Sequence, residues 1–138
     1  MSDRVRTKLV EQLDQWFSKY IRLRDSDAHG RFVCVSCARV LPIHIADCGH
    51  YIPREHMATR YMEQNCHAQC VDCNRIQSGN MTQYRNRLVM MYGSEYVNEL
   101  DRKKYVTEKI SNYELEALLD HYKRKVKELR NQKPNVKI

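Results

Sequence analysis

The chain has 138 residues, of which 42% are hydrophobic and 30% charged, and it contains only four glycines and three prolines. This composition suits one globular domain, or a small domain with helical extensions, and excludes a disordered chain. The apolar runs are too short to span a bilayer. The N-terminus lacks the apolar segment of a signal peptide. A net charge of +7 favours a polyanionic partner such as DNA, although a merely basic surface is compatible with the charge alone. A cytoplasmic protein is the expectation.

The N-terminal region, residues 1–28, is predicted to be one amphipathic helix over residues 3–24. Apolar residues recur there at spacings of three and four between charged ones, which is typical of a helix with one buried face. The members of this apolar stripe are Val5, Leu9, Leu13, Trp16, Tyr20 and Leu23. The segment DSDAHG at 25–30 contains turn residues and is expected to end the helix at Gly30.

The central region, residues 31–80, is predicted to hold short strands and a helix. The β-prone segments at 31–37 and 41–52 predict strands, and residues 53–65 predict a loop with a helical turn. A short second strand precedes Cys70, and a helix is expected from about Val71 to Ser78.

The C-terminal region, residues 81–138, is predicted to be helical. We expect helices over residues 82–93, from a serine cap at Ser94, and over residues 111–132. The last of these begins with the capping box formed by Ser111 and Glu114. Its apolar stripe at 115–129 and the stripe at 5–23 are candidate interfaces of a homodimer, or they pack within one chain.

Four of the six cysteines form two C-x-x-C pairs, Cys34/Cys37 and Cys70/Cys73. In a reducing compartment this spacing indicates a tetrahedral Zn²⁺ site rather than disulfides. Four thiolates leave no open coordination position, so the zinc is expected to be structural. Cys48 and Cys66 stand apart and are expected to be buried thiols.

The segment DCGHYIPR at 47–54 concentrates ionisable side chains between the two cysteine pairs. If four cysteines complete the zinc site, His50 is not needed as a ligand and is available as a base. A neutral histidine near its ordinary pKa can accept a proton from water at physiological pH. Taken alone, however, a histidine in a strand more often has a structural role.

The order of DCGH at 47–50, Asn65 and then C-x-x-C-N at 70–74 resembles the zinc-containing HNH or ββα-metal nucleases. The longer series LDQWFSKYIRLRDSD, CVSC, DCGHYIPR, ATRYMEQNCHAQC, CNRIQSGN and YRNRLV resembles the phage lambda NinG (Rap) family. The resemblance implies an α+β fold with a small zinc-stabilised ββα-metal core (HNH-like, His-Me finger) flanked by N-terminal and C-terminal helices. It also implies a phage- or prophage-encoded endonuclease for branched DNA such as D-loops and Holliday junctions.

The same resemblance implies specific roles. His50 would be the general base, Asn74 a direct ligand of a catalytic Mg²⁺ or Mn²⁺, and Asp47 a metal ligand or an orienting group. Arg54 is the leading candidate for a phosphate clamp, because its guanidinium fork fits a phosphate. Asn65 is a candidate supporting residue or an ordinary turn residue, and His67 is a candidate for support through packing or hydrogen bonding. Further DNA contacts are expected from Arg60, Arg75, Arg85 and Arg87.

Two other interpretations fit parts of the pattern. A zinc-ribbon module that binds DNA without cleaving it explains the cysteines and the charge, but not the coincidence of D-x-G-H and C-N. An HNH nicking nuclease of other specificity explains all the motifs, because only the family resemblance favours branched DNA. A junction nuclease that makes two symmetric cuts is expected to be a homodimer.

Overall fold

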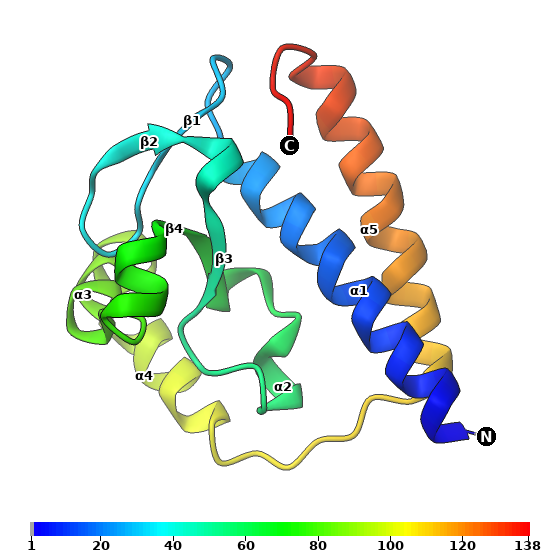
Figure 1. Ribbon diagram of the computed structural model, residues 1–138. Helices are drawn as coiled ribbons and strands as arrows, with labels where there is room; N and C mark the ends of the chain where they lie inside the picture. Colours follow the sequence, from blue (N-terminus) through cyan, green and yellow to red (C-terminus); the bar gives the residue numbers. More distant parts are fainter. Residues whose placement is uncertain (1) are drawn as a thin grey trace.

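Two long helices pack side by side along one side of the molecule (Figure 1). The computed structural model describes residues 2–138, and it contains α1 (Ser2–Asp25) and α5 (Asn112–Gln132). The helices run parallel, because Arg6 near the start of α1 donates to the Ile110 carbonyl just before α5, whereas Lys133 just after α5 contacts the end of α1. The two predicted apolar stripes therefore pack against each other within one chain.

This packing creates a core shared by the helices and the cysteine-rich segment. Phe17 of α1 packs edge-to-face on Tyr122 of α5, with ring centroids 4.9 Å apart. The buried members from α1 and α5 are Leu13, Phe17, Tyr20, Ile21, Leu23, Leu115, Leu119, Tyr122 and Val126. Cys34, Cys66, Cys70 and Cys73 belong to the same cluster. None of the helices in the described part of the chain is long and apolar enough to cross a membrane.

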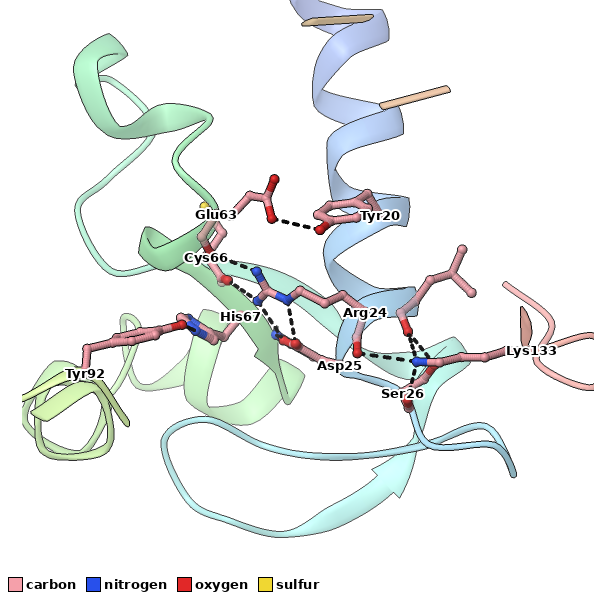
Figure 2. A network of polar contacts seen from close by, with 12 residues as sticks. Tyr20, Arg24, Asp25, Ser26, Glu63, Cys66, His67, Tyr92 and Lys133 are labelled. Atoms are coloured by element: carbon pink, nitrogen blue, oxygen red, sulfur yellow. Dashed lines mark hydrogen bonds and ion pairs between the residues drawn. The ribbon is translucent and has the colours of Figure 1, made fainter. Parts of the chain in front are cut away.

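The C-terminal end of α1 is held by a polar network (Figure 2). The Nζ of Lys133 donates to the carbonyl oxygens of Leu23 at 2.7 Å and Ser26 at 2.6 Å, which attaches the segment after α5 to the end of α1. Arg24 donates to the Cys66 carbonyl at 2.7 Å. The carboxylate of Asp25 accepts from the Ala68 amide at 2.8 Å, so α1 is attached to the strand that contains Ala68.

Four short strands form two separate antiparallel hairpins. The first pairs β1 (Arg31–Val33) with β2 (Val40–Pro42), and the second pairs β3 (Asp47–His50) with β4 (Cys66–Gln69). In the second hairpin Asp47 lies opposite Gln69 and His50 lies opposite Cys66.

The predicted continuous strand over 41–52 is wrong, because a 3₁₀ turn at Ile43–Ile45 divides it between the two hairpins. Pro42 cannot donate to a strand ladder, and Ile43 is buried with its amide bonded to the Gly30 carbonyl at 2.8 Å. These two residues direct the chain out of the first hairpin before the second begins at Asp47.

The segments that flank β4 are helical turns. The predicted loop with a helical turn at 53–65 is confirmed as α2 (Met57–Arg60) and a 3₁₀ turn at Glu63–Asn65. The helix expected from Val71 is a single π-helical turn at Asp72–Ile76 rather than an α-helix. This turn contains Cys73, whose sulfur lies near those of Cys70 and of the first cysteine pair.

The remaining helices, α3 (Met81–Tyr92) and α4 (Ser94–Lys103), form a second, smaller core. Its buried residues are Val35, Ile52, Tyr84, Leu88, Val97 and Leu100. The predicted serine cap of α4 is wrong, since Gly93 at φ 88° occupies the cap position and Ser94 is already helical. The predicted cap of α5 is confirmed, because the Ser111 side chain accepts from the Glu114 amide at 3.0 Å.

Candidate active site

The two C-x-x-C pairs meet in space. The Sγ atoms of Cys34, Cys37, Cys70 and Cys73 all lie within 4.8 Å of one another. The Sγ atoms of Cys37 and Cys70 are 3.8 Å apart. A tetrahedron with Zn–S bonds of about 2.3 Å has edges of about 3.8 Å, so this separation fits zinc. The cluster could hold the zinc ion that the spacing predicts.

Hydrogen bonds favour the thiolate form of Cys37, whereas burial raises the pKa of Cys34 and of Cys73. The Cys70 amide donates to Cys34 Sγ at 3.3 Å, and Arg39 donates to Cys37 Sγ at 3.2 Å and Cys70 Sγ at 3.3 Å. Burial opposes ionisation of Cys37, but the hydrogen bonds from Arg39 outweigh it and lower the pKa of Cys37 to about 6. Arg39 was not identified from the sequence, because its contact depends on how the first hairpin folds.

A cleft of about 450 Å³ collects the residues predicted to carry the chemistry. Asp47 and His50 enter it from β3, Arg54 from the following loop, and Asn74 and Arg75 from the π turn. Helix α1 covers one wall with Asp14, Phe17 and Ser18. The fold thus brings together side chains from segments that are far apart in the sequence.

The His50 imidazole has a defined orientation. Its Nε2 lies 2.9 Å from the Arg60 carbonyl oxygen. A carbonyl can only accept, so Nε2 carries the hydrogen in the neutral ring and Nδ1 keeps a lone pair. Burial lowers the pKa of His50, and the Arg60 hydrogen bond offsets only part of that effect. The ring is therefore neutral at physiological pH and can accept a proton at Nδ1.

Asp47 and Asn74 are in direct contact with each other and line the same cleft as His50. The amide nitrogen of Asn74 donates to Asp47 Oδ2 at 2.8 Å, which leaves the Asn74 carbonyl oxygen as a second oxygen donor. Arg75 also donates two hydrogen bonds to Asp47, from Nε to Oδ2 at 2.9 Å and from Nη2 to Oδ1 at 2.8 Å. Although burial opposes it, the Arg75 and Asn74 hydrogen bonds lower the pKa of Asp47. A carboxylate and an amide oxygen are suitable ligands for Mg²⁺.

Asn65 is buried and ties the loop between β3 and β4. Its Oδ1 accepts from the Ile52 amide at 2.8 Å, and its Nδ2 donates to the Ile52 carbonyl at 3.0 Å and the Thr59 carbonyl at 3.1 Å. These bonds fix the chain just after His50. This arrangement is the one expected of a supporting residue rather than of a reacting one.

His67 lies behind the hairpin in a buried tyrosine pair. Its Nδ1 lies 3.2 Å from the Tyr84 hydroxyl and its Nε2 lies 2.8 Å from the Tyr92 hydroxyl. The Tyr84 hydroxyl in turn donates to the Gly49 carbonyl at 2.7 Å. Burial lowers the pKa of His67 to about 4, so this ring is neutral, and its two contacts link β4 to α3.

The predicted DNA-contacting arginines have different surroundings. The Arg54 side chain is 61% exposed at the cleft and lies 3.7 Å from Asp14, whereas the Arg60 side chain is only 16% exposed in an ion pair with Asp14. Arg85 is paired with Asp101 on α4. Arg87 lines a separate hollow together with Asp25 and His67. The structure therefore places Arg54 and Arg75 at the cleft, holds Arg60 half-buried in its pair with Asp14, and places Arg87 elsewhere.

Asp14 was missed from the sequence. It accepts from both Arg60 nitrogens, at 3.0 and 2.5 Å, and from the Tyr61 hydroxyl at 2.8 Å. A carboxylate beside an apolar stripe is common on helix surfaces, so the sequence offers no specific signal for this contact.

Comparison with known proteins identifies the family. The family model described as Bacteriophage Lambda NinG protein matches residues 3–132. "Protein ninG" of Escherichia phage lambda is 35% identical over 133 residues, covering 91% of this chain and 59% of the relative. "Protein ninG" of Salmonella phage P22 is 34% identical over 133 residues, covering 91% of this chain and 60% of the relative. This chain thus spans about 60% of the length of these relatives. No solved structure matches. The resemblance predicted from the motifs is confirmed: this chain belongs to the NinG family.

Proposed function

We propose that this protein is a metal-dependent DNA endonuclease that acts on branched recombination intermediates such as D-loops and Holliday junctions. The observation that carries the proposal is the cleft that His50, with Nδ1 available to accept a proton, lines together with Asp47, Asn74 and the exposed Arg54. A branched-DNA substrate follows from the NinG family resemblance rather than from this geometry. The protein is proposed to be phage- or prophage-encoded and to act in the bacterial cytoplasm.

In the proposed reaction His50 Nδ1 takes a proton from a water molecule as the water oxygen forms a bond to phosphorus. The bond from phosphorus to the 3′ oxygen breaks, and that oxygen is protonated by solvent. Burial keeps His50 neutral before the reaction. The Arg60 carbonyl then stabilises the imidazolium, because the bond from Nε2 strengthens when the ring becomes charged.

The remaining groups act on the phosphate. Asp47 and Asn74 would hold one Mg²⁺ or Mn²⁺, which when bound stabilises the negative charge on the phosphate and the leaving oxygen. Arg54 can approach the phosphate from the cleft mouth with both guanidinium nitrogens. Asp14 holds Arg54 near the cleft without burying it.

This proposal treats β3, β4 and the π turn as a ββα-metal core of the HNH or His-Me finger type. The cysteine cluster joins the first hairpin to the end of β4 and to that turn. A zinc ion there would fix both ends of the candidate site without touching the substrate. The proposed zinc and the proposed catalytic cation therefore have separate ligands and separate roles.

One observation favours a non-catalytic module that binds DNA. Both carboxylate oxygens of Asp47 already accept hydrogen bonds from Arg75, so Asp47 has a structural role available without any metal. On this alternative the cleft contacts phosphate without cleaving it.

Cleavage of a labelled four-way junction and of a matched duplex, each with Mg²⁺, Mn²⁺ or EDTA, separates these functions. The proposal expects junction cleavage with metal, weaker duplex cleavage, and none with EDTA. Tight binding without cleavage supports the DNA-binding module. Equal cleavage of both substrates supports an HNH nuclease of other specificity. Light scattering with and without junction tests the proposed homodimer, whose interface lies outside the stripes that α1 and α5 use within the chain.

A further inference from the structure

We propose that Cys48, His50 and Cys66 form a second metal site, which takes a soft divalent cation such as Zn²⁺ and inhibits the protein by occupying its candidate base. One ligand atom from each residue lies within 4.8 Å of the other two, the same limit that holds for the four-cysteine cluster. The inhibitory part of this inference rests on the proposed nuclease function. The metal site itself does not.

The hairpin places these three side chains on one face. Cys48 and His50 are two positions apart on β3, so their side chains point to the same side of the strand. His50 lies directly opposite Cys66 on β4. Side chains that face each other across an antiparallel pair are in contact range. The register of the hairpin therefore fixes the group, and no loop movement is needed to assemble it.

The chemistry of the group suits zinc. Two thiolates and one imidazole are among the common ligand sets for Zn²⁺, with a water molecule as the fourth ligand. Two thiolates also balance the 2+ charge, so binding leaves no net charge in a partly buried place. Mg²⁺ prefers oxygen ligands and does not compete for this site.

An ion can reach the group from solvent. Cys48 and His50 both line the cleft, and they are half-buried, whereas Cys66 is fully buried behind them. The Cys66 thiol and the His50 Nε2 both face the Arg60 carbonyl, at 3.7 and 2.9 Å. Coordination through Nδ1 would occupy the lone pair needed for catalysis, and coordination through Nε2 would replace the Arg60 hydrogen bond that orients the ring. Either mode disables His50 as a base.

The first test counts metal ions. Protein purified with one Zn²⁺ per chain is titrated with Co²⁺, and metal content and thiolate-to-cobalt absorption bands are recorded. With Mg²⁺ in excess to fill the proposed site at Asp47 and Asn74, the wild type is expected to take up one further equivalent of Co²⁺ with new thiolate bands, and Cys48→Ala is expected to take up none. Ser18→Ala is the matched control, because Ser18 lines the same cleft and offers no soft ligand. Absence of a second equivalent in the wild type, or its retention in Cys48→Ala, overturns the site.

The second test measures junction cleavage in Mg²⁺ as free Zn²⁺ is raised above the first equivalent. Loss of a general base costs roughly 100-fold, so wild-type cleavage should fall by that order while Cys48→Ala resists. If Cys48→Ala has lost the second ion and is still inhibited equally, the inhibitory role is overturned. A wild type that cleaves nothing in any metal contradicts the proposed function, and the metal count still decides the site.

Discussion

The Nε2 of His50 lies 2.9 Å from the main-chain carbonyl oxygen of Arg60, and the Arg60 side chain grips Asp14 on α1 with two hydrogen bonds. The carbonyl oxygen of Arg60 fixes the tautomer of the His50 imidazole. The guanidinium of Arg60, bonded to Asp14, holds the Arg60 main chain in place. The N-terminal helix, which contributes no base or metal ligand to the proposed reaction, is therefore linked to the candidate base through the last residue of α2. We propose on this basis that Arg60 positions His50; its predicted contact with DNA stays a prediction.

Arg60→Met should disturb both stability and catalysis. The pair of Arg60 and Asp14 is half-buried, and Asp14 keeps the Tyr61 hydroxyl as a partner, so the expected loss is about 1–2 kcal/mol of unfolding free energy. Junction cleavage should fall by about tenfold or more, because a displaced base is less effective. Arg54→Met is the matched control: its side chain is 61% exposed, so stability should change by less than about 0.5 kcal/mol while junction binding weakens. Urea unfolding and cleavage assays on both variants check this, and equal stability of the two variants would contradict it.

Asn65→Ala should be strongly destabilising. The substitution removes three hydrogen bonds at a fully buried site and leaves both main-chain groups of Ile52 without that partner. The expected loss is about 3 kcal/mol in unfolding free energy. Zinc content at low temperature should remain near one per chain, because no cysteine ligand contacts Asn65. A loss below about 1 kcal/mol would show that Asn65 is an ordinary turn residue.

The unfolding free energy should decrease as the pH is lowered, because of His67. Because burial holds the pKa of the folded-state ring at about 4, below the ordinary 6.5, the unfolded chain takes up the proton first as the pH falls between these values. The native state should therefore lose up to about 3 kcal/mol from this residue across that window, with full stability above it. His67→Gln keeps polar groups near Tyr84 and Tyr92 but does not titrate, so its unfolding free energy should depend less on pH. Measurements between pH 5.5 and 7 in excess zinc check the difference, and parallel pH dependences would contradict it.

Arg75→Ala should lower the concentration of Mg²⁺ needed for half-maximal cleavage. The Arg75 guanidinium occupies both oxygens of Asp47 and competes with the proposed cation for that carboxylate. The pair is largely exposed on the arginine side, so the expected change is small, roughly two- to fivefold. Arg85→Ala is the control, since Arg85 pairs with Asp101 instead. A raised Mg²⁺ requirement for Arg75→Ala would mean that Arg75 supports the metal site rather than competing with it.

The sequence alone predicted the features that depend on local pattern. The stripes at 5–23 and 115–129 repeat every three to four residues, and the helices lie where that period predicts. The four cysteines assemble because each C-x-x-C pair already places two sulfurs close together. The cap at Ser111 follows from the side chain of one residue and the amide of another three positions on.

The features that depend on tertiary placement could not be predicted. Ile43 divides an apparently continuous β-prone segment because it enters the core, which no local pattern shows. Arg60 and Asp14 are 46 positions apart and meet only because α1 docks against the hairpin loop. The group of Cys48, His50 and Cys66 depends on strand register, which in a four-residue strand is set by long-range packing.

The most direct measurement is single-turnover cleavage of a labelled four-way junction in Mg²⁺ by the wild type, His50→Ala and His44→Ala. His44 is exposed in the turn between the hairpins and serves as the control histidine. His50→Ala should cleave at least about 100-fold more slowly while it keeps its zinc, its fold and its junction affinity, and His44→Ala should match the wild type. Cleavage by His50→Ala at the wild-type rate, or loss of its fold together with its activity, would contradict the assignment of His50 as the base.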